Sequence, residues 1–294
     1  MEWIKIPFRA AWRLIMQDEG VELSGYIAFT AFFSLFPFLI FLAALAGFLG
    51  HRESADGFIE EMFNLMPDDV AGTLAPAVSE VLDGREGGLL TVGILTTLWF
   101  ASNGIEALRA GLNRAYGVTE ARAIWWRRLQ SIAFVIAGGF VIFFLSLAVI
   151  LGPLVWKVLG PRASDVLETR LVFVTTRYLL AVLLLLGALL LLHRWLPNTK
   201  QAFARVLPGV CVTTLLWLLG ASAFSWYIGH LAHYAAFYGS LGGVAITLMF
   251  FYISAILFIF GAEINAVWRE RSGRGRPPRD RAGEGGDTQD LHPA

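Results

Sequence analysis

Six long stretches of almost uninterrupted apolar residues constrain this chain more than any other feature of its sequence. They cover residues 26–50, 89–107, 131–156, 171–195, 206–228 and 241–267. A helix needs roughly 20 apolar residues to cross the hydrocarbon layer of a bilayer, and each stretch supplies about that number. Because backbone groups in hydrocarbon must be hydrogen-bonded within their own segment, the stretches can span only as helices. The sequence therefore predicts an all-α integral membrane protein, a bundle of six transmembrane helices.

The overall composition supports the same class of protein. Of the 294 residues, 56% are hydrophobic and only 16% are charged, which excludes an ordinary soluble domain. We predict three parts along the chain: an amphipathic interfacial helix at 1–20, a six-helix transmembrane domain at 21–268 and a disordered cytoplasmic tail at 269–294. The tail is rich in Gly, Pro and Arg and lacks apolar periodicity, so it has no face to bury.

The basic residues are distributed very unevenly between the two sides of the predicted bundle. If the N-terminus is placed inside, seventeen of the 23 Lys and Arg residues fall in the inside segments. Cytoplasmic segments of membrane proteins carry this excess of Lys and Arg. The sequence thus predicts that both termini are cytoplasmic.

The first 20 residues show the spacing of an amphipathic helix. Its large apolar residues are Trp3, Phe8, Trp12 and Ile15. Three basic residues, Lys5, Arg9 and Arg13, recur every four positions on another face. A helix with aromatic and basic faces beside a first span is typical of a membrane surface, and we predict it on the cytoplasmic lipid surface. The alternative is a solvated helix that packs on the bundle.

The connection between the first two stretches, residues 51–88, is the largest segment on the predicted outer side. It contains nine carboxylates and two arginines. Two amphipathic patterns lie on either side of Pro67, which two aspartates follow, as at a turn and a helix start. We predict two short helices there.

Polar residues within the apolar stretches are the candidates for function. In the first stretch, Thr30, Ser34 and Pro37 share one helical face. Pro37 removes one helix hydrogen bond and exposes the carbonyl of Phe33, which a nearby hydroxyl can help to satisfy. The sequence predicts a kinked polar stripe at Thr30 and Ser34, which is either a structural kink or a binding surface.

Charged residues gather toward the predicted cytoplasmic ends of the second and sixth stretches. Asn103, Glu106 and Arg109 are spaced by threes on one helical face, and Arg114 follows them. Helical rise places Glu106 about 25 Å and Glu263 about 33 Å below their outer helix ends, so both should lie at the cytoplasmic boundary. We predict an ion pair of Glu263 with Arg109 or Arg114, which locks two helix ends, lines a cytoplasmic vestibule, or does both.

Two further polar residues complete the candidate binding set. Asn265 lies in the run LFIFGAEINAVW, and Arg177 lies six residues into the fourth stretch. Arg177 either snorkels to the outer surface or faces a polar cavity as an anion contact. Cys211 is the one cysteine, and the pair His230 and His233 lacks an evident third ligand, so we expect no metal site and no cofactor.

Several motifs resemble those of the YihY/BrkB family of bacterial inner-membrane proteins. They are SLFPFL in the first stretch, WFASNGIEALRAGLNRAYGV in the second, LPNTK before the fifth, and FYGSLGGVAITLMFFYISAILFIFGAEINA at the end. The resemblance covers residues 9–270 in matching order. It implies six spans, a plasma-membrane location and a poorly defined activity. Some members are linked to virulence and serum resistance, and transport of lipids or envelope components has been suggested for the group.

Members of that family have also been labelled ribonuclease BN, an enzyme of transfer-RNA processing. Metal-dependent hydrolysis of a phosphodiester needs clustered His and Asp ligands around one or two ions. The five histidines of this chain are scattered, and no acids and histidines gather on one predicted cytoplasmic surface. We therefore expect neither an enzyme nor a nucleic-acid partner.

The sequence favours a transporter or flippase-like protein for a lipid or other envelope component. Membrane lipids are the expected partners, and a lipid or amphipathic solute is the expected substrate. Because no GxxxxGK[ST] loop is present, movement would be passive, ion-coupled or partner-driven. The alternative is a non-transporting membrane scaffold for envelope or virulence-related assemblies. A cavity between the spans would favour transport and a solidly packed core the scaffold, while the oligomeric state stays open.

Overall fold

The apolar stretches of the sequence form long helices. The computed structural model describes residues 5–49, 75–76, 87–159, 166–199, 201–230 and 240–271. Its long helices are α2 (Gly20–Leu49), α5 (Gly87–Ala115), α6 (Ile124–Leu159), α7 (Val166–Trp195), α8 (Phe203–His230) and α10 (Ser240–Arg271). The short helix α1 (Lys5–Trp12) and the π-helix η1 (Arg13–Gln17) precede α2. Because no strand occurs among the described residues, the predicted all-α class is confirmed.

Several of these helices are suited to a membrane. Within the described ranges, four are long and apolar enough to cross one: Gly20–Leu45, Ile124–Phe143, Phe203–Tyr227 and Gly242–Glu270. Leu179–Trp195 of α7 is a shorter apolar helix. The count of six spans therefore stays a prediction. The two short helices predicted at 51–88 fall mostly outside the described residues, as does the tail beyond 271.

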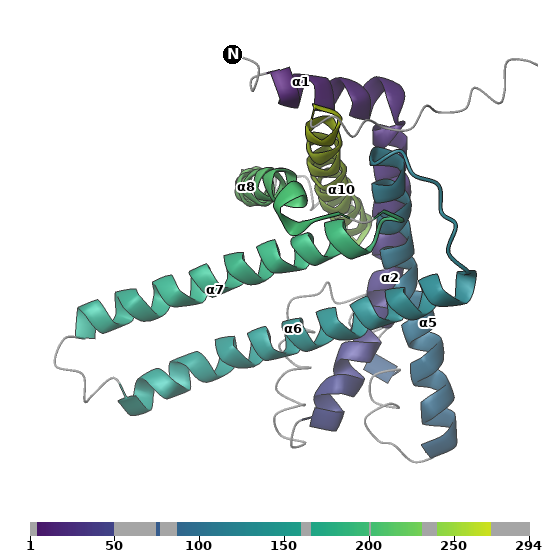
Figure 1. The fold of residues 1–294 in the computed structure, drawn as a ribbon. Helices are drawn as coiled ribbons and strands as arrows, with labels where there is room; N and C mark the ends of the chain where they lie inside the picture. The colour runs from purple at the N-terminus through teal and green to yellow at the C-terminus, as the bar shows by residue number, and fades with distance from the viewer. Residues whose placement is uncertain are drawn as a thin grey trace, which may run out of the picture.

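α2 and α5 form a central pair. They lie side by side in Figure 1 and run in opposite directions, with Gly111 of α5 packed against Ile27 of α2 and Gly104 against Ser34. α10 joins this pair, since Ile259 also packs at Gly111. α6 and α7 extend to one side of the pair in Figure 1. The six long helices thus meet near one region and diverge from it.

Apolar side chains pack between the helices in separate clusters. One cluster, between α2, α5 and α6, includes Phe41, Leu98 and Val135. Another, toward the ends of α5 and α10, includes Leu112 and Ile259. Lipid tails are as apolar as these side chains, so such packing stabilises the bundle through van der Waals contact rather than through release from water.

The N-terminal helix packs on the bundle through one face. Ile6 and Ala10 of α1 are buried against Ile264 and Val267 of α10, and α1 lies across the end of α10 in Figure 1. The opposite face of α1 carries the exposed side chains of Phe8 and Trp12, and Ile15 and Met16 of η1 are exposed as well. The docked face agrees with the alternative in which this helix packs on the bundle. Contact of the exposed face with lipid stays a prediction.

α8 and α10 approach each other closely where two glycines meet. A Cβ atom at Gly209 of α8 would overlap the carbonyl oxygen of Gly261 and would lie 2.6 Å from the Asn265 side chain. A Cβ atom at Gly261 would overlap the Thr213 hydroxyl and lie 2.8 Å from the Gly209 carbonyl oxygen. Small residues at a crossing let helix backbones approach in hydrocarbon, where close packing drives association.

Alanine at either glycine should loosen this crossing. For Gly209→Ala and Gly261→Ala we expect a lower Tm in detergent, because an overpacked contact costs about 1–3 kcal/mol. The control is Gly187→Ala in α7, where the described residues leave open space beside the added Cβ. There alanine should leave the Tm unchanged or raise it, since glycine in a helix costs roughly 0.5–1 kcal/mol relative to alanine. Equal Tm values for all three variants would contradict the close crossing.

Candidate functional site

Polar side chains gather at one end of the bundle, where α2 begins and α5 and α10 end. Hydrogen bonds there join η1 to α10, the α7–α8 connection to α5, and α10 to α8. We call this set of contacts the polar end. The charge distribution predicts that all of these segments lie on the cytoplasmic side. Their meeting at one end agrees with that arrangement, while the side of the membrane stays a prediction.

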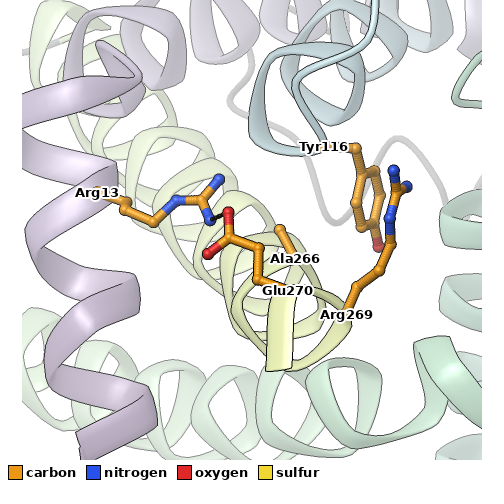
Figure 2. A pocket seen from close by; sticks show the side chains of 5 residues that line it. All are labelled: Arg13, Tyr116, Ala266, Arg269 and Glu270. Atoms are coloured by element: carbon orange, nitrogen blue, oxygen red, sulfur yellow. Dashed lines mark hydrogen bonds and ion pairs between the residues drawn. The ribbon is translucent and has the colours of Figure 1, made fainter. Parts of the chain in front are cut away.

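Arg13 of η1 is the centre of the first group of charges. Its side chain is almost fully buried, and its Nε lies 3.0 Å from Oε2 of Glu263. Its Nη1 donates a hydrogen bond of 2.7 Å to Oε1 of Glu270, and its Nη2 lies 3.6 Å from Oδ2 of Asp18. Figure 2 shows Arg13 reaching Glu270 at the end of α10. Three carboxylates around one buried guanidinium offset the cost of taking its charge out of water.

The structure corrects the predicted partner of Glu263. This residue is fully buried, and its ion pair is with Arg13 rather than with Arg109 or Arg114. The two predicted arginines pair with other acids: Arg109 with Glu106 at 3.1 Å and Arg114 with Glu19 at 2.7 Å. Glu263 thus forms an ion pair, as predicted, but the predicted partner is wrong.

Helix register explains this error. Ile259 of α10 packs at Gly111 of α5. One turn further along α10 lies Glu263, and the same step along α5 leads to Ala115, whose carbonyl Arg13 contacts. Depth counted from the helix starts assumes that α5 and α10 begin at the same level. Gly111 lies 24 residues after the start of α5, but its neighbour Ile259 lies only 19 residues after the start of α10, so the count places Glu263 too close to the level of Arg109.

A second group of polar residues joins α5 to α6. Arg109 is 1% exposed, and its Nη1 lies 3.1 Å from Oε1 of Glu106. Ser131 of α6 bridges this pair, because it accepts a hydrogen bond of 2.9 Å from Arg109 and donates one of 2.6 Å to Glu106. Asn103 accepts a hydrogen bond of 2.8 Å from Arg128. The predicted residues share one face of α5, and in the described structure they bind α6.

The prediction from sequence misses a further network at the polar end. The carboxylate of Glu120 accepts hydrogen bonds from Arg122 at 2.8 and 2.7 Å and from Asn113 at 3.0 Å. Arg122 also donates to the carbonyl of Leu196, and the backbone N–H of Asn198 donates to Oδ1 of Asn113 at 2.8 Å. The sequence offers one indication of this network. Asn113 lies in the motif WFASNGIEALRAGLNRAYGV and Asn198 in the motif LPNTK, both of which resemble motifs of the YihY/BrkB family.

Asn265 fixes α10 to the start of α8. Its Oδ1 accepts a hydrogen bond of 2.7 Å from the N–H of Gly209. Its Nδ2 donates to the carbonyl of Val206 at 3.0 Å and to the hydroxyl of Tyr116 at 3.3 Å. The amide of Asn265 is therefore satisfied on both sides while almost fully buried. The residue acts as a hydrogen-bonding contact between helices, as polar residues in membrane helices often do.

A cavity of about 390 Å³ lies between the helices, next to the polar end. All six long helices contribute to its wall, which consists almost entirely of apolar side chains. Ser34, one of the two hydroxyls of the predicted polar stripe, is buried in this wall. Thr30 is half-buried on α2 and does not line the described part of the cavity.

Two other predictions concern Arg177 and the absence of a metal site. Arg177 lies in α7, but its side chain is outside the described part of the structure. Among the described residues, no three His, Cys, Asp or Glu side chains gather in a way that could hold a metal ion.

These features define a helical membrane protein whose helices are joined by polar contacts at one end and surround an apolar cavity. The chain belongs to the virulence factor BrkB family, whose family model matches residues 11–285. This confirms the resemblance seen in its motifs.

Two relatives illustrate the similarity. The chain is 35% identical over 257 residues to the ribonuclease-like protein YfkH of Bacillus subtilis, a match that covers 86% of this chain and 91% of the relative. It is 28% identical over 269 residues to a UPF0761 membrane protein of Photobacterium profundum, covering 88% of this chain and 79% of the relative. No solved structure matches the chain.

Substitutions at the Arg13 group should destabilise the protein in a defined order. Glu263→Gln leaves Arg13 with Asp18 and Glu270, so its cost should fall below the about 3–5 kcal/mol typical of breaking a buried pair. Arg13→Gln leaves all three carboxylates without their shared guanidinium and should lower the Tm in detergent further. Glu19→Gln is the control, because Glu19 is 72% exposed and surface pairs contribute about 0–1 kcal/mol. Equal Tm values for Glu263→Gln and Glu19→Gln would contradict a structural role of the buried pair.

The Glu120 carboxyl, between α5 and α6, makes the stability depend on pH. Burial acts to raise its pKa, but hydrogen bonds from Arg122 and Asn113 outweigh burial and lower the pKa from 4.5 to about 2. A carboxyl with a lower pKa in the folded state stabilises that state above its unfolded pKa. This stabilisation is lost as the pH falls from 4.5 toward 2.

We therefore expect Glu120→Gln to have a lower Tm than the wild type near neutral pH, and this difference to shrink between pH 4.5 and 2. Thermal unfolding in detergent across this pH range measures it. Glu22→Gln, at an exposed position of α2, is the matched control and should follow the wild type at every pH. A difference that stays constant down to the lowest pH would contradict the role of the Glu120 charge.

Proposed function

We propose that this chain is a transporter or flippase-like protein that moves a lipid or other amphipathic envelope component. The observation that carries the proposal is the cavity of about 390 Å³ walled by all six long helices. Ligand pockets typically have volumes of about 300–1,000 Å³. A wall without charged side chains among its described residues suits the hydrocarbon part of a lipid.

In this proposal the chain crosses the bacterial inner membrane six times, with both termini in the cytoplasm. Two observations support this orientation: seventeen of the 23 basic residues fall in the inside segments, and the predicted inside ends meet at the polar end. The polar end then lies at the cytoplasmic end of the cavity. Membrane lipids are the partners of the protein in this arrangement.

We propose no catalytic role and no nucleic-acid partner for the chain. The name of the Bacillus subtilis relative, a ribonuclease-like protein, applies to that protein. Support for a role without catalysis comes from the chemistry of the two regions. The described cavity wall is apolar, whereas the acids and arginines of the polar end bind one another and backbone groups across helices.

Filling the cavity should slow transport without unfolding the protein. Gly138 of α6 lines the cavity, and the described residues leave open space beside it, so Gly138→Phe puts a ring into that space. The vesicles contain the purified protein and a fluorescently labelled glycosyldiacylglycerol, a lipid whose headgroup is uncharged. Dithionite quenches only the labelled lipid in the outer leaflet, and we expect wild-type protein to speed the movement of inner-leaflet lipid to that leaflet. Gly138→Phe should slow this severalfold while its Tm stays near that of the wild type.

Gly187→Phe in α7 is the matched control. It also has open space beside it and does not line the described cavity, so it should transport like the wild type. Wild-type rates for Gly138→Phe would contradict transport through the cavity. Vesicles with wild-type protein that behave like empty vesicles would favour the scaffold function.

A further inference from the structure

Four hydrogen-bonding side chains interrupt the apolar wall of the cavity. They are Ser34 of α2, Thr213 and Trp217 of α8, and Ser254 of α10. No Asp, Glu, Lys, Arg or His side chain lines the cavity among the described residues. The wall therefore offers hydrogen bonds but no charge, which restricts the kind of ligand that it fits.

Two of these hydroxyls lie at the same level of the bundle. At Gly111 of α5, Ile27 of α2 and Ile259 of α10 meet, and this contact sets the register of the three helices. Ser34 is seven residues from Ile27 and Ser254 is five from Ile259, in both cases away from the polar end. Helical rise therefore places the two serines about 10 and about 8 Å from the contact.

The Ser34 hydroxyl has unused hydrogen-bonding capacity. Ser34 is 8% exposed and lines the cavity, and no hydrogen bond among the described residues involves its hydroxyl. Nearby in the same helix, Pro37 has no N–H to give to the carbonyl of Phe33. A hydroxyl that faces an apolar cavity without a partner is costly, and a ligand in the cavity can be that partner.

The Ser254 hydroxyl keeps a free proton. It accepts a hydrogen bond of 3.1 Å from Nε1 of Trp217, which leaves its own O–H available as a donor. The hydroxyl of Thr213 is used differently, because it donates to the carbonyl of Leu257 at 3.3 Å. Ser34 and Ser254 are thus the two hydroxyls of the described wall that are free to bind a ligand group.

We propose that the cavity binds a neutral amphiphile through an uncharged hydrogen-bonding group, a hydroxyl or an ester, held between Ser34 and Ser254. This inference rests on the proposed function and names the chemical class of its substrate. The hydrocarbon part of the amphiphile packs along the apolar wall. A charged headgroup finds no partner in the described wall, because the charged residues of the polar end bind one another.

A pair of photoactivatable probes tests the inference with the full-length protein in detergent. One probe is a long-chain alcohol that carries a diazirine, and the other is an alkane of the same length with the same diazirine. Both should label peptides of the cavity wall, with the alcohol labelling at lower concentrations. Each hydrogen bond to an uncharged group changes affinity by roughly five-fold, so Ser34→Ala and Ser254→Ala should each raise the alcohol concentration needed by about that factor.

The alkane probe distinguishes lost hydrogen bonding from lost folding. Its labelling of both alanine variants should match that of the wild type. Ser222→Ala is the matched control for the alcohol, since this exposed hydroxyl of α8 bonds only its own helix at Leu218 in the described structure and should leave labelling unchanged.

Two results overturn the inference, and they separate it from the proposed function. In the first result, both probes label the cavity, but the alcohol labels Ser34→Ala and Ser254→Ala as it labels the wild type. This result refutes binding through an uncharged hydrogen-bonding group and does not contradict transport. Failure of both probes to label the cavity wall refutes the inference together with the proposed function.

Discussion

The buried guanidinium of Arg13 is the contact on which the arrangement of the helix ends depends. It joins two segments that are far apart in sequence, since its partner Glu270 lies 257 positions further along the chain. Taking such charges out of water costs several kcal/mol per ion unless they are paired. The N-terminal segment therefore cannot leave α10 without depriving Glu263 and Glu270 of their shared cation. Two asparagines join further segments to the same end of the bundle. Asn265 of α10 accepts a hydrogen bond from the N–H of Gly209 in α8. The N–H of Asn198, in the α7–α8 connection, donates to the side chain of Asn113 in α5.

This concentration of polar contacts at one end has a consequence for the interior. Apolar helices gain little from leaving lipid for one another, so in the middle of the bundle only shape and close packing favour contact. Hydrogen bonds and ion pairs at the polar end hold the helices in place even where their middles do not fill the space between them. A cavity can persist under these conditions. The cavity borders the polar end. Leu108 in its wall is next to the ion-paired Arg109 in sequence, and Leu192 in its wall is next to the buried His193.

The sequence predicts the helices and the nature of the polar end better than it predicts the individual partners. Apolar length does not depend on which helices touch, so the all-α class is confirmed. The role of Arg13 is missed for a geometric reason. Residues four apart drift by about 40° around a helix at each step, so Lys5, Arg9 and Arg13 do not share one face for long. Arg9 is 61% exposed, whereas Arg13 has turned into the bundle. Its partner lies near the far end of the chain, which no local pattern reveals.

We propose that polar contacts at one end hold open an apolar cavity in which a neutral amphiphile binds. The most direct test is a cryo-electron microscopy map of the full-length protein in lipid nanodiscs, at a resolution that shows side chains. We expect Arg13 against Glu263, and elongated density between α2, α8 and α10 that passes Ser34 and Ser254. A map in which leucine and phenylalanine side chains close the space between these helices, with no density beside the two serines, would contradict the account.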